Sequence, residues 1–334
     1  MPNSPKTKPY YPPWINDFEA GHYDNDDIEL PIKKKINFSQ VDKKPKKEEP
    51  LVKILAVGSD IEMFLAKPDG KPVPVVGLIG GTKKNPMPVL NKPGYALQED
   101  NVALEFNIPP ATSSAEFVYS ILRMQEECAT IAKKLGLVPA IEASMRFDLS
   151  DLQSEQAKLI GCEPDYNAWT RMMNEPPALV GDLETLRTAA GHIHISYLIN
   201  GEVPKENLMD HLSILESLVM ALDLFVAVGL TYTELPNERN KLYGKPGAFR
   251  SKPYGLEYRT ISNQWTKNAE LIDYVYKQTL YASEFVNSMN TPNQFLRKYE
   301  ETIYLALNGE KEARKMLTSG FNIALPSDKF IINK

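Results

Sequence analysis

The chain has 334 residues, of which 43% are hydrophobic, and its net charge is −5. This length is enough for one large domain or two moderate ones, and the negative balance argues against nucleic acid or an anionic membrane as a partner. Two cysteines are too few for a disulfide framework and are typical of a reducing cytoplasm. No apolar run reaches 18 residues without a charge, and no signal-peptide pattern opens the chain, so we expect a soluble, unexported protein.

The first 50 residues differ in composition from the rest. They hold eight prolines and two lysine clusters, and they have little periodic apolar pattern. Such a segment cannot bury enough surface to offset its ordering entropy. We therefore predict an extended arm over residues 1–50 and a single domain over residues 51–334. The arm is either a solvated tail or, because it carries Tyr10, Tyr11 and Trp14, a segment that docks on the domain or on a partner protein.

Strand-like and helical patterns alternate irregularly along the domain, which favours the α+β class over a regular βαβ repeat. A capping-box pattern, Ser113 to Glu116, opens a helix that runs to Leu135, and Gly136 ends it. The sequence predicts strands over 51–65, 72–78, 96–108, 187–198 and 255–261, helices also over 205–230, 267–289 and 311–317, and a loop over 237–254.

Polar residues recur at every second position in several of these strands. Asp60 and Glu62 are two apart, and Glu105 and Asn107 follow Glu99 and Asn101 at the same parity. Alternate residues of a strand share one face, so each strand pairs an apolar face with a row of oxygen ligands. Paired carboxylates can hold hard cations, whereas the alternative is a solvated outer face.

Two further strands carry cationic groups in the same pattern. His192 and His194 share one face, where they could bind a transition metal or donate to phosphate and carboxylate oxygens. Their acidic surroundings suit magnesium better than zinc. Glu257 and Arg259 share a face of the last strand. Arg239, Lys241 and Arg250 precede them in a loop, and arginine forks match phosphate oxygens, although a basic surface loop is the alternative.

The order of these motifs resembles the carboxylate–amine ligase superfamily, which includes glutamine synthetase and glutamate–cysteine ligase. Within it, the chain is most similar to the phage phiEco32-like COOH–NH2 amidoligase type 2 group. The resemblance covers about residues 51–290, and two positions depart from the pattern, Asp60 in place of Glu and Ala190 in place of Gly. The segments that carry it are Gly80 to Lys83, Gln98 to Asn101, Gly161 to Trp169 and Gly255 to Arg259.

The resemblance implies a glutamine-synthetase-like antiparallel sheet, with the active site on one face and helices on the other. It also implies ATP- and Mg2+-dependent amide formation through an acyl phosphate, and a structural rather than nucleophilic Cys162. By the same resemblance the metal ligands would be Asp60, Glu62, Glu99, Glu105 and Glu257; the catalytic groups Arg239, Arg250, Arg259, His192 and His194; and the ATP-binding groups Lys83, Asn101, Asn107 and Lys241.

The carboxylate and amine substrates stay open between small molecules and peptides, and a homo-oligomer is as compatible as a monomer. We expect the protein in the cytoplasm of an infected bacterial host. One alternative is a non-catalytic virion or scaffold protein that reuses the ligase fold. Another is a metal-dependent hydrolase centred on His192 and His194.

Overall fold

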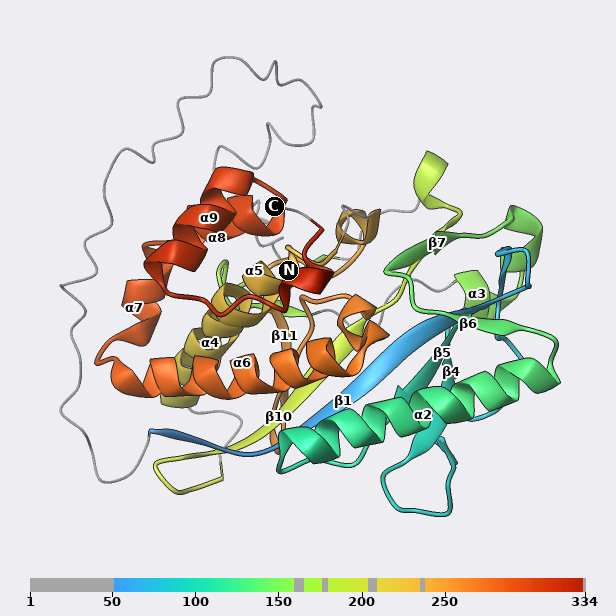
Figure 1. Ribbon diagram of the computed structural model, residues 1–334, viewed down its shortest axis with the longest axis horizontal. Helices are drawn as coiled ribbons and strands as arrows, with labels where there is room; N and C mark the ends of the chain where they lie inside the picture. Colours follow the sequence, from blue (N-terminus) through green and yellow to red (C-terminus); the bar gives the residue numbers. More distant parts are fainter. Residues whose placement is uncertain (1–50, 159–164, 176–179, 204–208, 235–237, 333–334) are drawn as a thin grey trace, which may run out of the picture. The chain divides into compact units, whose positions relative to one another are not determined.

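The computed structural model describes residues 51–158, 165–175, 180–203, 209–234 and 238–332 (Figure 1). All of these lie in one compact unit, Val41–Lys334. The expected arm over residues 1–50 falls outside the described residues and stays a prediction. Cys162 also lies outside them, together with the first four residues of the motif at 161–169.

The centre of the unit is a ten-stranded antiparallel sheet with the order β3-β4-β5-β1-β10-β12-β11-β8, to which β2 and β6 add beside β1. A separate pair, β7 and β9, forms a small second sheet. The strands are β1 (Val52–Ala66), β2 (Pro72–Val73), β3 (Met87–Pro88), β4 (Ala96–Asp100), β5 (Ala103–Asn107), β6 (Val138–Ala140), β7 (Ser144–Arg146), β8 (Tyr166–Asn167), β9 (Leu186–Thr188), β10 (Gly191–Ile199), β11 (Ala248–Lys252) and β12 (Gly255–Tyr258).

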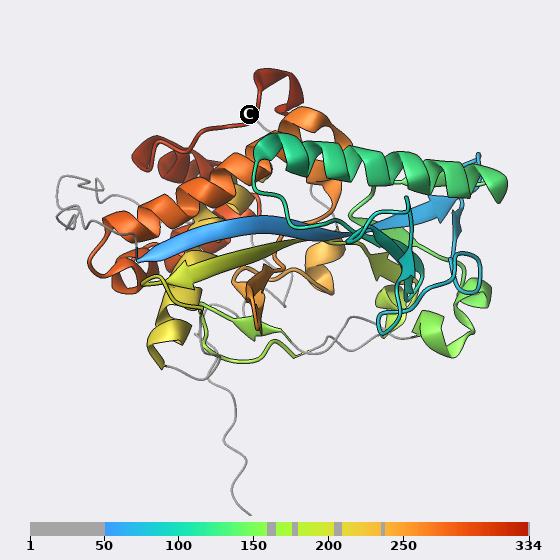
Figure 2. The same cartoon turned by 90° about the horizontal axis from the view of Figure 1, so that it is seen from below.

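Helices cover one face of the sheet, as Figure 2 shows for α2 and α6. Helix α2 (Ser114–Lys134) begins where predicted, because the Ser113 hydroxyl accepts the Glu116 N–H at 3.3 Å. It ends before Gly136, whose φ of 71° suits a residue without a side chain. Helix α6 (Ala269–Ser288) packs against α2 and β1. The apolar side chains in the second half of β1, Ile61, Met63 and Leu65, are fully buried. This arrangement confirms the α+β class.

A single apolar helical run forms the second part of the core. It consists of α4 (Met209–Leu222), a π-helical turn (Asp223–Ala227) and α5 (Val228–Leu230). By length and composition its part from His211 to Leu230 could cross a membrane, but 83% of the most apolar 18-residue stretch is buried inside the unit, where α4 packs against α6, β11 and β12. The run lies within the helix predicted over residues 205–230. The remaining helices are α3 (Glu155–Lys158), α7 (Pro292–Arg297), α8 (Glu300–Leu307) and α9 (Lys311–Gly320).

Four expected elements differ from the structure. The strand over 96–108 is a hairpin of β4 and β5 that turns at Asn101, whose φ is 54°. The strand over 187–198 is divided between β9 and β10, and the loop over 237–254 contains β11, which pairs with β12. Of the strand over 72–78, only Pro72 and Val73 are extended. Each difference is a turn or an edge pairing that apolar periodicity does not record.

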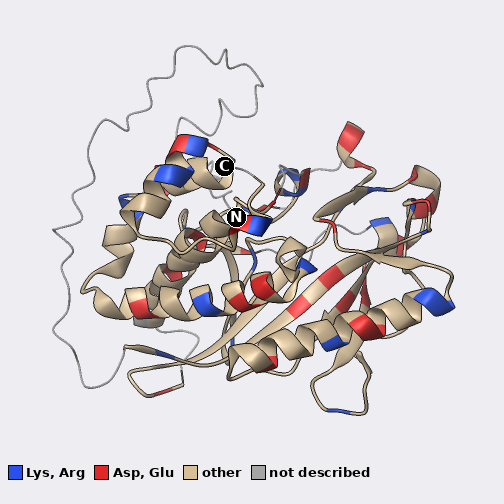
Figure 3. Ribbon diagram, viewed as in Figure 1, with Lys and Arg blue, Asp and Glu red and all other residues tan. Residues whose placement is uncertain are grey.

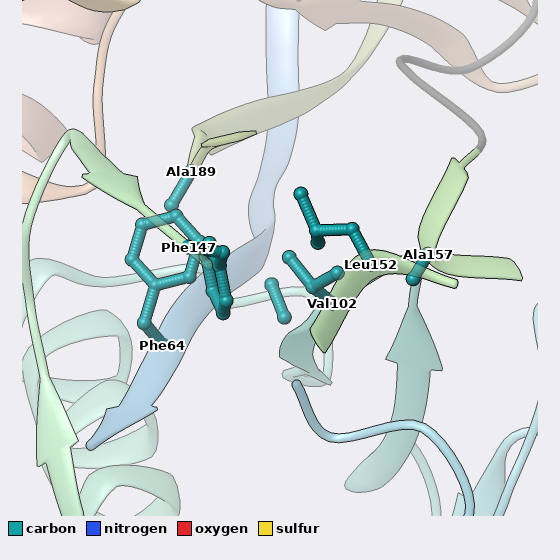
Figure 4. Close-up of a cluster of buried hydrophobic side chains, with 7 residues drawn as sticks. Phe64, Val102, Phe147, Leu152, Ala157 and Ala189 are labelled. Carbon is teal, nitrogen blue, oxygen red and sulfur yellow. The ribbon is translucent and has the colours of Figure 1, made fainter. Parts of the chain in front are cut away.

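A small apolar cluster lies on the sheet face opposite the main helices, at the carboxyl end of β1 (Figure 4). Phe64 and Phe147 meet edge to face with ring centroids 5.8 Å apart. Phe64 lies two residues after Glu62, and Ala103 two residues before Glu105, so the cluster adjoins these acids on their own face. The cluster consists of Phe64, Val102, Ala103, Phe147, Leu152, Ala157 and Ala189.

Candidate active site

Strand register brings the predicted polar residues into one array. On β1, Asp60 pairs with His192 of β10 and with Asn107 of β5. Glu62 pairs with Glu105. Residues directly opposite each other on antiparallel strands project from the same face, so segments distant in sequence share this surface. Figure 3 shows the acidic residues along the middle of β1 and its neighbours.

The array continues across the strands that follow β10. His194 pairs with Glu257 of β12, and Glu257 pairs with Arg250 of β11. Arg259, directly after β12, is 1% exposed and contacts Glu257. The alternation seen in the sequence therefore places carboxylates, imidazoles and guanidiniums on a common floor, as predicted.

Asp60 is the carboxylate shared by the two histidines. Its Oδ1 lies 3.0 Å from Nδ1 of His192 and 3.1 Å from Nε2 of His194. Burial alone would raise the pKa of Asp60, but the charges and hydrogen bonds of the two imidazoles outweigh it and hold that pKa well below its usual range. Burial and the charge of Arg259 lower the pKa of His192. The hydroxyl of Tyr254 lies 2.5 Å from Nδ1 of His194.

The other acids crowd together without a comparable set of cations. Burial and the Asp100 carboxylate raise the pKa of Glu62 to about 8, although the Ala190 N–H donates to Glu62 at 2.8 Å. Burial together with Asp60 and Asp100 raises the pKa of Glu105 well above its usual range. Acids placed this close to one another gain stability from a cation that screens their charges.

Two groups of these side chains have the geometry of cation sites. Ligand atoms of Asp60, His192 and Glu257 all lie within 4.8 Å of one another. The same holds for Glu62, Asp100 and Glu105. The donors are mainly carboxylate oxygens, which hard cations such as Mg2+ prefer. The residues present therefore fit magnesium.

Basic side chains border the first of these groups. Lys252 Nζ lies 2.6 Å from Glu257 Oε2, and Arg259 contacts the other oxygen of the same carboxylate. Asp165 binds Arg259 Nε at 2.7 Å and Arg250 Nε at 3.5 Å. The guanidinium of Arg259 also lies 5.1 Å from the centre of the Tyr243 ring. These contacts fix cationic groups beside the cation ligands, where they could bind a phosphate.

A cavity of about 170 Å³ opens above this floor. It brings together cation ligands from both groups and the basic residues, and it includes Lys83, which comes from the loop after β2. The lining residues are Asp60, Lys83, Pro86, Gln98, Asp100, Glu105, Asn107, His192, Arg250, Lys252, Glu257 and Arg259.

Glu99 and Asn101 do not lie where the sequence pattern placed them. Because β4 and β5 form a hairpin, Gln98 and not Glu99 pairs with Glu105. Glu99 faces away from the array, and its carboxylate accepts N–H groups of Gly77, Ile79 and Gly80 at 2.8–2.9 Å. Asn101 occupies the turn and does not line the cavity. The prediction that these two residues share the site face is wrong.

Arg239 and Lys241 also lie away from the cavity. The guanidinium of Arg239 donates to the carbonyls of Thr260 at 2.7 Å and Arg259 at 3.2 Å, and it borders a separate cavity of about 260 Å³. Lys241 pairs with Glu238 at 2.8 Å on the exterior. Loop residues have no periodic pattern, so the direction of these two side chains could not be predicted from the sequence.

Three candidate functional residues were not predicted from the sequence. Asp100 belongs to a cation group. Its position depends on the turn at Asn101, and the sequence indicates that turn only through the Asp100-Asn101 pair, because Asn tolerates the positive φ of a tight turn. Asp165 lies in the motif at 161–169, to which no role was assigned. Lys252 was hidden in the expected loop, two residues after Arg250, and strand parity would have placed it beside Arg250.

Comparison with known proteins supports the resemblance read from the sequence. Residues 170–317 match the family described as phage phiEco32-like COOH.NH2 ligase-type 2. The matched segment contains β10, β11 and β12, with both histidines, Glu257 and Arg259. The match therefore agrees with the predicted family over this segment, which is less than half of the chain. No curated protein matches the chain.

Solved structures similar to this chain are distant. An apo form of GmaS aligns with a TM-score of 0.38 and 11% identity over 83% of this chain and 71% of that one. A novel glutamine synthase homolog aligns with a TM-score of 0.37 and 12% identity over 81% and 66%. A GmaS/ADP complex aligns with a TM-score of 0.36 and 12% identity over 81% and 68%.

Proposed function

We propose that this protein is an ATP- and Mg2+-dependent carboxylate–amine ligase that forms an amide through an acyl phosphate. The observation that carries the proposal is the joint lining of one cavity by carboxylates of both cation groups and by the side chains of Arg250, Lys252 and Arg259. Phosphoryl transfer depends mainly on positioning and on neutralising charge, and this floor offers groups for both.

The two carboxylate groups would hold magnesium, which when bound neutralises charge on the phosphate oxygens of ATP. Asp60, His192 and Glu257 form one ligand set, and Glu62, Asp100 and Glu105 form the other.

The basic residues would bind the phosphates of ATP directly. Arg250 and Lys252 line the side of the cavity formed by β11, and Lys83 reaches it from the loop after β2. Arg259 is held between Asp165 and Glu257, so it presents a fixed guanidinium to the transferring phosphoryl group.

The reaction proceeds in two balanced steps. An oxygen of the substrate carboxylate attacks the γ-phosphorus, the bond to the bridging oxygen breaks, and ADP leaves. The amine nitrogen then attacks the acyl carbon, phosphate leaves with the electrons of the carbon–oxygen bond, and the amine loses a proton. Fixed cationic groups favour the first step because negative charge accumulates on the phosphoryl oxygens.

Two measurements test this function. Isothermal titration calorimetry with a non-hydrolysable ATP analogue should show binding that requires Mg2+. Incubation with ATP, Mg2+, a panel of carboxylates and hydroxylamine as the amine should release ADP and yield a hydroxamate. A chain that binds no nucleotide in the presence of Mg2+ would refute the proposal and favour a non-catalytic scaffold.

Matched lysine variants sharpen the test. Lys252→Gln removes a cation that lines the cavity, and we expect it to weaken binding of the analogue about tenfold. Lys241→Gln removes the same charge from an exposed pair with Glu238 and should leave binding unchanged. Equal losses in the two variants would show that the cavity is not the phosphate site.

A further inference from the structure

We propose that Asp165 is a positioning residue that holds Arg250 and Arg259 in the orientation needed to bind phosphate, an inference that rests on the proposed function. Asp165 itself does not line the cavity, whereas both arginines do. Its effect on the substrate would therefore pass through the two guanidiniums.

Backbone register explains why Asp165 lies beside these arginines. Strand β8 pairs with β11, with Tyr166 opposite Phe249. Continuing this antiparallel register by one residue places Asp165 opposite Arg250, which in turn pairs with Glu257. Asp165 thus ends a row of alternating charge that runs across β11 and β12 to His194.

A single carboxylate oxygen of Asp165 contacts both arginines. This oxygen, Oδ1, forms ion pairs with both and lies 2.7 Å from Nε of Arg259 and 3.5 Å from Nε of Arg250. The side chains of Asp165 and Arg259 are 8% and 1% exposed, so solvent screens this pair little. A buried carboxylate this close to two guanidiniums attracts both of them strongly and therefore holds their charged groups on its own side of the site.

Removal of the Asp165 carboxylate would also affect the position of Glu257. Arg259 contacts both acids, and Glu257 also belongs to the cation group with Asp60 and His192. Of these two acids, only Glu257 would then be left to contact Arg259. The guanidinium of Arg259 would draw the Glu257 carboxylate away from the proposed cation position. Asp165 therefore keeps the phosphate-binding and cation-binding halves of the site apart.

The variant Asp165→Asn distinguishes a positioning role of Asp165 from a purely electrostatic effect of its negative charge on nucleotide binding. The substitution removes a negative charge beside an anion site, so charge alone predicts tighter binding of the ATP analogue with Mg2+. Positioning predicts the reverse, a dissociation constant raised at least about tenfold, because a displaced guanidinium loses its aligned hydrogen bonds. Asp165→Glu retains the carboxylate and should recover part of the loss.

Two further measurements guard the interpretation. Asp148→Asn removes the same charge from an exposed pair with Lys71 and should leave the dissociation constant unchanged. A crystal structure of Asp165→Asn should show both guanidiniums displaced, whether or not nucleotide binds. Unchanged or tighter binding, or guanidiniums in their original positions, would overturn the assignment. A wild-type chain that binds no analogue would instead refute the proposed function, and the crystal structure would then decide the role of Asp165 alone.

Discussion

Replacing Glu99 by glutamine tests the largest difference between the sequence pattern and the structure. In the structure this carboxylate anchors the loop after β2, since Oε1 accepts the N–H groups of Ile79 and Gly80 and Oε2 accepts that of Gly77. A glutamine keeps one acceptor oxygen but turns an amide nitrogen toward the third donor. Hydrogen bonds to charged groups are worth about 1.5–3 kcal/mol, so we expect Glu99→Gln to lower the free energy of unfolding by about 1–3 kcal/mol.

The variant should also loosen the loop without affecting cation binding. Urea denaturation measures the free energy of unfolding, and amide hydrogen exchange over residues 77–83 measures how well the loop is protected. Calorimetry with MgCl2 measures the cation affinity. Glu105→Gln is the matched control, because it removes a carboxylate from a cation group and should weaken Mg2+ binding while leaving the loop protected. Loss of Mg2+ binding in Glu99→Gln, with unchanged exchange in the loop, would refute the structural placement and restore the expected ligand.

Burial raises the pKa of Asp223 to about 6, so its contribution to stability is present below about pH 4 and lost as the pH rises through 6. Relative to Asp223→Asn, the wild-type chain should therefore lose about 3 kcal/mol in urea denaturation between pH 4 and pH 7; a constant difference would contradict the shift. In Gly191→Ala the new Cβ would lie 2.5 Å from Nε1 of Trp265, which should cost about 1–3 kcal/mol of stability in the same assay. Gly58→Ala meets ordinary contacts of 3.6 Å or more and serves as the control, and equal losses would refute the steric argument. Cys128 is buried with a raised pKa, so with the other cysteine replaced by serine it should react with a thiol reagent only as the chain unfolds; fast labelling of the native chain would contradict its burial.

Strand parity explains why much of the candidate site could be predicted from sequence. Asp60 and Glu62, like His192 and His194, share a face because residues two apart on a strand always do. Their convergence on one floor additionally requires the register of β1 with β5 and β10, which the order of motifs indicated only through the family resemblance.

Turns and loops account for the residues that were misplaced. One left-handed residue, Asn101, reverses the chain and moves Glu99 to the opposite face, an effect that no apolar periodicity records. Arg239 lies in a short helical turn, where direction depends on tertiary contacts with the backbone near Thr260. Asp165 reaches the arginines only because the two-residue strand β8 pairs with β11 at the edge of the sheet, and so short a strand has no pattern in the sequence.

The central place of β1 has a consequence for experiments with shortened chains. A fragment limited to the family-matched residues 170–317 would retain His192, Glu257 and Arg259 but would lack Asp60 and the whole Glu62 group. It would also leave the edge of β10 that β1 occupies without its neighbour, exposing unpaired backbone that invites self-association. Such a fragment should aggregate rather than report on catalysis, so function is best tested by point substitution in the 334-residue chain.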